Sequence, residues 1–206
     1  MKNLMLSTLT LFILILNTKA QEVKNIRYFD IDNKEINKSV FDEKRSTNVF
    51  LDIPGDSSNH RKLINREEQG KIKDKTKLLL LLETASNKEI DSLKPIVIIY
   101  HPGQDSSNST GNTDYIKAKH KELKTALLKQ YKIKPIYIYA EITGTGQYGS
   151  SINWIKDPEQ SIKKHFFKYH YPSGSFVVID RNGNYVSYLG EYMTSAILAV
   201  TKKMTE

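Results

Sequence analysis

Two short apolar segments with an amphipathic segment between them constrain the fold of this chain most. Residues 95–100 (PIVIIY) and 134–142 (KPIYIYAEI) are rich in β-branched and aromatic side chains, a composition typical of buried strands. Between them, apolar residues recur at helical spacing over 113–131, with Thr113 or Asp114 as the expected helix cap. This order predicts a right-handed βαβ unit whose two strands are parallel.

The residues after this unit predict a second helix, a β-hairpin and a closing helix. Asp157-Pro158 is typical of a helix start, because proline at the first helical position loses no hydrogen bond. Residues 175–180 and 185–189 predict two strands, and the Asn182-Gly183 turn between them is a strong hairpin signal. A helix over 191–203 completes a mixed α/β sheet protein.

The N-terminal part of the chain predicts an additional layer of strands and helices. We expect strands over 26–31 and 48–53, the second of them stopped by Pro54-Gly55. Ser39, with Asp42 three residues later, has the spacing of a helix N-cap.

Two further segments precede the first strand of the βαβ unit. Residues 60–77 are strongly charged, and we expect them to be exposed and partly helical. Residues 78–82 are five consecutive leucines, which favour a buried helix ending near Asn87.

The first twenty residues have the pattern of an export signal. Lys2 precedes an apolar run over 4–16, and Thr18-Lys19-Ala20 provides a small-residue cleavage site. The run is shorter than the roughly twenty residues that span a bilayer. We therefore expect cleavage after Ala20, no stable membrane anchor afterwards, and a periplasmic or secreted mature protein.

Charge and cysteine content exclude several functions. The net charge of +8 is spread among acidic residues, which is typical of a solvated surface and not of a nucleic-acid interface. The chain has no cysteine, so thiol-disulfide exchange and thiol peroxidase activity are excluded.

The element order and three motifs resemble the exported thioredoxin-like proteins. The motifs are the strands 95–100 and 134–138, and Tyr171-Pro172 followed by FVVIDRNG at 176–183. The resemblance implies a three-layer α/β/α sandwich with a mixed sheet over 90–206, preceded by an α+β extension over 21–89.

The resemblance also implies two features of the site. The Tyr171–Pro172 bond should be cis, as in the family's cis-proline loop, and with a trans bond the resemblance itself would fail. The family's Cys-x-x-Cys follows the first strand of the βαβ unit, where this chain has HPGQDSSNST at 101–110. Serine cannot replace a redox thiol, so the resemblance implies the scaffold without its redox chemistry.

A binding role is the function that these observations favour over an enzymatic one. Thioredoxin-like folds hold extended peptides against the cis-proline loop, which requires no thiol. We expect a groove between loops 101–111, 144–154 and 171–174, which holds an unknown peptide or protein partner and needs no cofactor. Exposed aromatic side chains of the glycine-rich loop and its surroundings would contribute. The candidate binding residues are His101, Gln104, Ser106, Ser107, Tyr148, Trp154, Tyr171 and Pro172.

The alternative is a metal-binding or acid/base site formed by His101, Asp105 and His170. Two imidazoles and a carboxylate could hold a divalent metal or transfer protons. The competing interpretation is that both histidines are structural, since short spacings typical of metal ligands are absent. Gly144–Gly149 has the spacing of a dinucleotide-binding loop but lacks an immediate helix, so we expect a flexible loop and no nucleotide.

Overall fold

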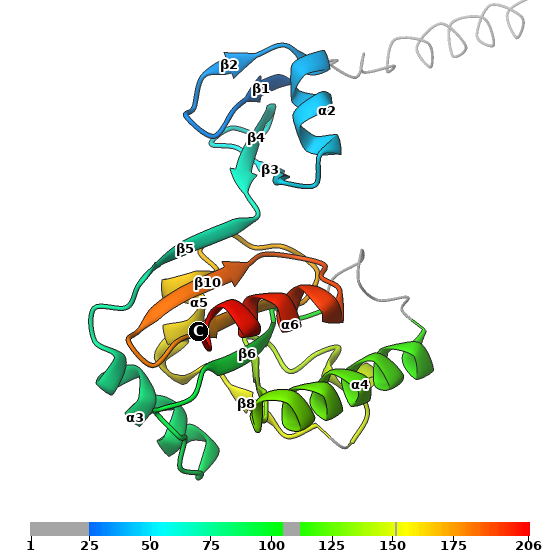
Figure 1. Cartoon of the computed structure of the whole chain (residues 1–206). Helices are drawn as coiled ribbons and strands as arrows, with labels where there is room; N and C mark the ends of the chain where they lie inside the picture. Colours follow the sequence, from blue (N-terminus) through cyan, green and yellow to red (C-terminus); the bar gives the residue numbers. More distant parts are fainter. Residues whose placement is uncertain (1–24, 105–111, 151) are drawn as a thin grey trace, which may run out of the picture.

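The computed structural model describes residues 25–104, 112–150 and 152–206. The predicted export signal at 1–20 lies outside these residues. The described chain forms a four-stranded sheet near its N-terminus and a six-stranded sheet that carries the remaining helices (Figure 1).

The smaller sheet has the strand order β2-β1-β4-β3 and is covered by one helix. Its elements are β1 (Arg27–Phe29), β2 (Glu35–Ile36), α2 (Lys38–Ser46), β3 (Phe50–Pro54) and β4 (His60–Asn65). Phe41 of α2 is buried, and its ring lies 4.9 Å from that of Tyr28. The N-cap of α2 is Asn37, which accepts a hydrogen bond from the backbone N–H of Val40. The prediction of Ser39 as the cap was therefore wrong by two residues.

The charged segment 60–77 is mostly β-strand, so the prediction of a partly helical segment holds only for residues 75–77, which begin α3, and the prediction of exposure holds for only part of the segment. It forms β4 and then β5 (Glu67–Lys71), which is antiparallel to β10 (Asn184–Tyr188) of the larger sheet. Leu63 and Ile64 are buried. The side chains of β5 are mostly exposed, because a strand at a sheet edge tolerates and often favours charge.

The larger sheet contains the predicted βαβ unit. Its strand order is β5-β10-β9-β6-β7-β8, and β6 is parallel to β7 but antiparallel to β9. All six residues of β6 are buried, which confirms that this strand is central. The other elements are β7 (Ile136–Tyr139), β8 (Trp154–Lys156) and β9 (Ser175–Ile179), with β6 spanning Ile96–His101.

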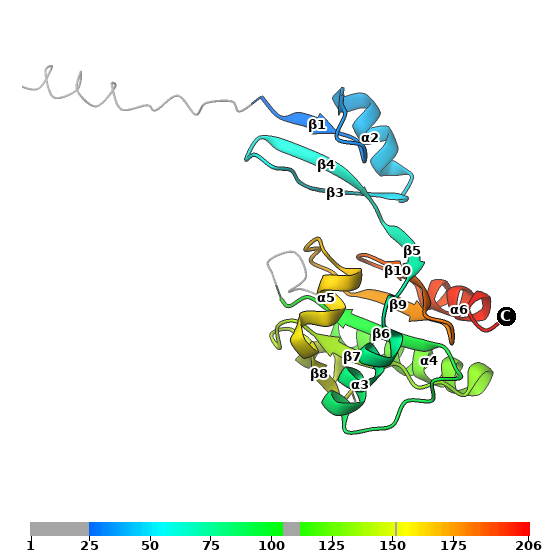
Figure 2. The same cartoon turned by 90° about the vertical axis from the view of Figure 1, so that its left-hand side faces the viewer.

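Helices cover both faces of this sheet (Figure 2). Alternate residues of β6 point to opposite sides, with Ile98 in one buried cluster and Ile99 in the other. The first face is covered by α3 (Lys75–Ser86) and α5 (Ser161–Phe166), and the second by α4 (Thr113–Tyr131) and α6 (Thr194–Lys203). The expected three-layer α/β/α sandwich with a mixed sheet is confirmed.

The leucine run forms the expected helix. Leu78 and Leu82, four residues apart on α3, are buried, whereas Leu80 is 64% exposed. Asn87 ends the helix in a left-handed conformation and donates its backbone N–H to Glu83. Leu51, Ile53 and Ile64 of the smaller sheet belong to the same buried cluster as this helix.

The prediction of a cis bond between Tyr171 and Pro172 was wrong, because no peptide bond between described residues is cis. Trans is the lower-energy form of an X-Pro bond, and the chain reaches β9 through Ser173 and Gly174 without needing the other isomer. By the criterion set from the sequence, the family resemblance therefore fails at this loop, and Pro172 does not correspond to the family's cis-proline. The strand order and layers, which define the fold, do not depend on it.

Candidate functional site

A groove of about 950 Å³ opens beside the C-terminal end of β6. It lies between α4, the start of α6, the loop 172–174 and a short 3₁₀ helix, η1 (Thr145–Tyr148). Three predicted binding residues, His101, Tyr148 and Pro172, line it. The fold therefore brings parts of the three expected loops to one groove.

Of the other predicted binding residues, Gln104, Trp154 and Tyr171 do not line this groove. Gln104 lies nearby, and its backbone N–H is 3.4 Å from the hydroxyl of Thr143. Tyr171 lines a small cavity of about 30 Å³ instead. Ser106 and Ser107 lie outside the described residues.

His101 is the last residue of the central strand β6, and it is buried. It is 1% exposed, and its Nε2 lies 3.0 Å from the carbonyl oxygen of Thr143. Burial lowers the pKa of this imidazole below 6.5, although the contact with Thr143 acts in the opposite direction. Gly144 closes over the ring: its φ is +84°, and a Cβ there would lie 3.0 Å from Nε2. His101 is therefore a neutral, tightly enclosed imidazole at neutral pH.

Tyr148 and Trp154 pack together instead of projecting from a loop. The ring of Tyr148 lies 5.5 Å from that of His101, 4.8 Å from that of His120 and 5.2 Å from that of Trp154. Trp154 begins strand β8, and both rings are half-buried. The expectation of exposed loop aromatics was wrong, because the glycine-rich segment folds as η1 and packs against α4.

His120 is a member of this ring cluster that the sequence analysis missed. It is 7% exposed, and burial, with a further contribution from Lys119, lowers its pKa to about 4. Its Nδ1 is buried and has no hydrogen-bond partner. The helical spacing of α4 could have indicated that His120 is buried, because it lies three residues before Leu123 on the buried side of the helix.

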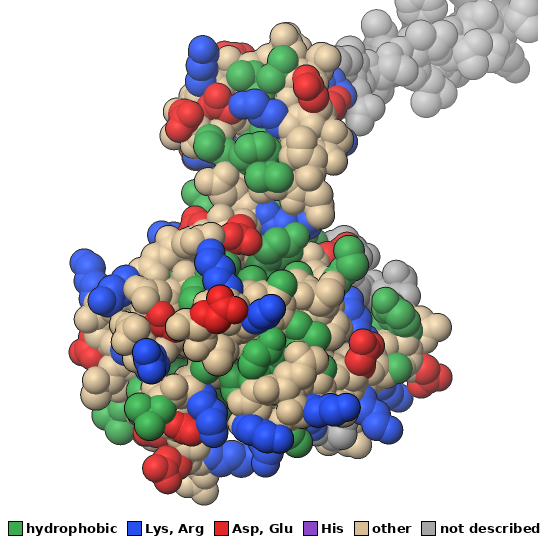
Figure 3. Space-filling view, in the orientation of Figure 1, with side chains coloured by type: hydrophobic (Ala, Val, Ile, Leu, Met, Phe, Trp, Pro, Cys, Tyr) green, Lys and Arg blue, Asp and Glu red, His purple; other side chains and the backbone are tan. Residues whose placement is uncertain are grey.

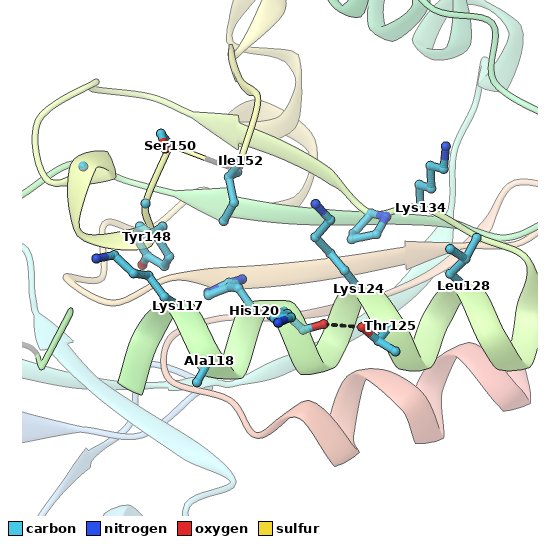
Figure 4. A pocket seen from close by; sticks show the side chains of 14 residues that line it. Lys117, Ala118, His120, Lys124, Thr125, Leu128, Lys134, Tyr148, Ser150 and Ile152 are labelled. Carbon is cyan, nitrogen blue, oxygen red and sulfur yellow. Dashed lines mark hydrogen bonds between the residues drawn. The ribbon is translucent and has the colours of Figure 1, made fainter. Parts of the chain in front are cut away.

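A second pocket, of about 1100 Å³, lies on the other side of His120 and Tyr148 (Figure 4). Gly149 faces the stem of Lys117 there, since a Cβ on this glycine would lie 3.2 Å from the lysine Cγ. Four lysines line this pocket, and none of the described residues that line it is acidic. They are Lys117, Lys121, Lys124 and Lys134. Lys117, Lys121 and Lys124 are three or four residues apart on α4, so they form a solvated cationic face of that helix.

The structure does not unite the residues of the alternative site. His101 lines the groove beside α4, whereas His170 is exposed and lines the small cavity with Tyr100 and Phe167, on the other face of the sheet. Asp105 lies outside the described residues. Among those described, no group of three or more His, Cys, Asp or Glu side chains could hold a metal ion. The alternative site thus gains no support.

Two residues that flank the strands of the smaller sheet also line the groove: Asn48, just before β3, and Arg66, between β4 and β5. The sequence analysis placed Arg66 in an exposed segment, but it is 7% exposed. None of the helices in the described part of the chain is long and apolar enough to cross a membrane.

No known protein family and no curated protein matches this chain. Its structure is similar to the pneumococcal exposed lipoprotein thioredoxin Etrx1 of Streptococcus pneumoniae strain TIGR4. The TM-score is 0.39 and the identity 15%, over 59% of this chain and 89% of that chain. A second similar structure is that of MTB DsbF in mixed oxidized and reduced forms. There the TM-score is 0.36 and the identity 11%, over 55% of this chain and 82% of that chain.

Both similarities are remote, so the fold assignment rests on the observed strand order and layers. That topology is a three-layer α/β/α sandwich with a mixed sheet, the arrangement that the sequence led us to expect of a thioredoxin-like domain, and the chain has no cysteine.

Proposed function

We propose that this protein is an exported, non-redox binding protein that holds a peptide or a protein segment in the groove beside β6. One observation carries the proposal: a thioredoxin-like scaffold without cysteine retains a groove of about 950 Å³ where loop 172–174, η1 and the end of β6 meet. A groove lined by aromatic side chains and backbone can hold an extended peptide without a thiol.

The composition of the groove supports a peptide over a small metabolite. Its volume is at the upper end of the range for drug-sized ligands. Tyr115 and Met193, which line it, are 65% and 73% exposed. Large exposed apolar side chains beside a groove are typical of surfaces that contact another protein.

Export is the second part of the proposal and rests on residues 1–20 alone. Expression of the full chain should yield a mature protein that begins at Gln21 and is found in the periplasmic or secreted fraction. Mass spectrometry of that fraction tests this part. A full-length protein retained in the cytoplasm would contradict it.

Peptide selection followed by a groove-filling substitution tests the binding role. Peptides selected from a random library on the mature chain should bind the wild type and lose at least tenfold in affinity for Ser195→Trp, because the indole would fill the groove beside α6. Lys202→Trp is the matched control, since this exposed residue lies on the same helix but does not line the groove.

Fluorescence anisotropy with the selected peptides measures both affinities. Equal affinities for wild type and Ser195→Trp would place binding elsewhere. The absence of any selected peptide would remove the proposed role.

A further inference from the structure

Arg66 is held at the junction of the two sheets, between β4 and β5. Its backbone N–H donates to the carbonyl of Val49 at 3.0 Å, and its own carbonyl accepts from the N–H of Leu189 at 2.8 Å. One bond goes to the smaller sheet and the other to the segment just after β10. These two backbone hydrogen bonds therefore fix the position of Arg66, whose side chain lines the groove.

The guanidinium of Arg66 is buried without a carboxylate partner. Nη1 donates to the side chain and the backbone carbonyl of Asn48, and the group lies 5.3 Å from the ring centre of Tyr188. Nε is buried with no hydrogen-bond partner. Among the described residues, no carboxylate lies within ion-pair distance of it.

This arrangement differs from that of other arginines in the same part of the chain. Arg27 pairs with Glu35, and Arg61 pairs with Asp52 at 2.7 Å. The first pair is exposed and the second is partly buried, and in both the arginine has a carboxylate partner. Arg66 has no such partner among the described residues, and leaving a buried charge unpaired is strongly destabilising. An unpaired guanidinium in a groove therefore indicates that its counter-charge comes from a bound partner.

The remaining charges of the groove favour an anionic occupant. Lys119 also lines it, and its ammonium donates to the carbonyl of Tyr192 at 2.8 Å and lies 5.7 Å from the centre of that ring. Glu191 is the only acidic residue among the described groove residues, and it accepts from the hydroxyl of Ser173. Two cations thus face the groove against one carboxylate.

We propose that the occupant of the groove is an acidic peptide segment whose Asp or Glu side chain pairs with Arg66, while apolar neighbours in the peptide contact Tyr115 and Met193. This inference rests on the proposed binding role and specifies its partner. A guanidinium recognises a carboxylate with charge-assisted hydrogen bonds from its N–H groups, and Arg66 lines the groove without a carboxylate partner among the described residues.

Two matched peptide pools test the pairing. Both are acetylated and C-terminally amidated, so that the central side chain is their only difference: Leu-Glu-Phe in one and Leu-Gln-Phe in the other, between randomised flanks. Calorimetric titration into the mature chain should show Glu peptides binding at least tenfold more tightly than their Gln counterparts. In Arg66→Met this preference should fall to less than twofold.

A control variant and a stability measurement complete the design. Lys124→Gln removes a cation from the second pocket and should leave the Glu preference unchanged. Arg66→Met should melt at or above the temperature of the wild type in the absence of peptide, because it removes an uncompensated buried charge. A loss of binding in a variant of unchanged stability is then not due to unfolding.

The possible failures are distinguishable. If neither pool binds, the proposed binding role fails. If both pools bind equally and Arg66→Met has no effect, the role stands and the acidic partner is wrong. An equal loss in Lys124→Gln would show long-range attraction instead of a pair. A marked destabilisation in Arg66→Met would mean that the free protein already neutralises this charge. Each of these two outcomes also overturns the inference.

Discussion

His120 is a buried imidazole whose titration should be visible in the stability of the protein. In the folded state its pKa is lowered to about 4, chiefly by burial, whereas an unfolded histidine titrates near 6.5. Between these values the unfolded state binds more protons, so stability falls as the pH decreases from about 6.5 to 4. His101, whose pKa burial also lowers, acts in the same direction.

The expected loss from His120 is about 3 kcal/mol over that range, from the difference in pKa at about 1.4 kcal/mol per unit. Urea unfolding of the wild type and of His120→Phe between pH 4 and 7 measures it. Phenylalanine keeps the ring between Tyr137 and Tyr148 but cannot be protonated. The variant should show the smaller pH dependence, and identical curves would contradict a buried, neutral His120.

Gly190 controls the position of Tyr171, a predicted binding residue. Its φ is +80°, and a Cβ there would lie 2.7 Å from the Tyr171 ring. Gly190→Ala should therefore destabilise the protein by about 1 kcal/mol or more and shift the environment of that ring.

Gly146→Ala is the matched control for this substitution, because a Cβ at Gly146 meets nothing within 4 Å. Thermal unfolding followed by calorimetry compares the two variants. Equal melting temperatures would show that Tyr171 is not seated against Gly190.

At the scale of elements, β5 and α3 belong with the larger sheet although they precede its first predicted strand. β5 pairs along its whole length with β10, and Ile72, Leu78 and Leu82 are buried in the cluster beneath α3. A domain boundary at residue 89 or 90 would remove β5 and α3 from the larger sheet, whereas a boundary after Arg66 would keep both with it and remove only Leu51, Ile53 and Ile64 from the shared cluster.

Two truncations test where the folding unit begins. Residues 67–206 should fold with a cooperative thermal transition, because they keep β5 and the buried face of α3. Residues 90–206 should lack one, since they leave the partners of Leu82 exposed to water. Circular dichroism on heating distinguishes them, and a cooperative transition in the shorter fragment would contradict this account.

The elements predicted correctly are those whose own residues strongly favour the secondary structure that they adopt. β6 and β7 combine β-branched side chains with a length suited to a strand, and Asn182-Gly183 specifies its hairpin through the turn, with Gly183 at a φ of +84°. The prediction for the β5 part of segment 60–71 was wrong because β5 is stabilised by backbone pairing with β10, more than one hundred residues away. The charged side chains of β5 do not themselves indicate that pairing.

The residues of the candidate site also divide into those indicated by their local sequence and those placed by distant contacts. His101 could be predicted because it follows an obvious strand, and Tyr148 and Pro172 because their loops belong to a resembled scaffold. Arg66 could not, since its burial arises from contacts with Asn48 and Tyr188. Those contacts depend on how the two sheets meet, which local patterns do not encode.

For the molecule as a whole, the central claim is that a cysteine-free thioredoxin-like scaffold binds a peptide in the groove beside β6. This claim joins the topology of the larger sheet to a groove that its helices and loops line together with Asn48 and Arg66. Figure 3 shows apolar side chains exposed on the face of the molecule that carries α6. The lysine-lined second pocket offers a clear alternative location on the same molecule.

NMR mapping of backbone amides on the ¹⁵N-labelled mature chain tests the claim most directly, with a selected peptide added in steps. We predict that the shifted signals cluster at Ser173, Gly174, Tyr148 and the first turn of α6, and that Lys121, Lys124 and Thr125 on the far side of α4 stay unchanged. Shifts confined to the lysine-lined pocket or to the smaller sheet, or no shifts at saturating peptide, would contradict it.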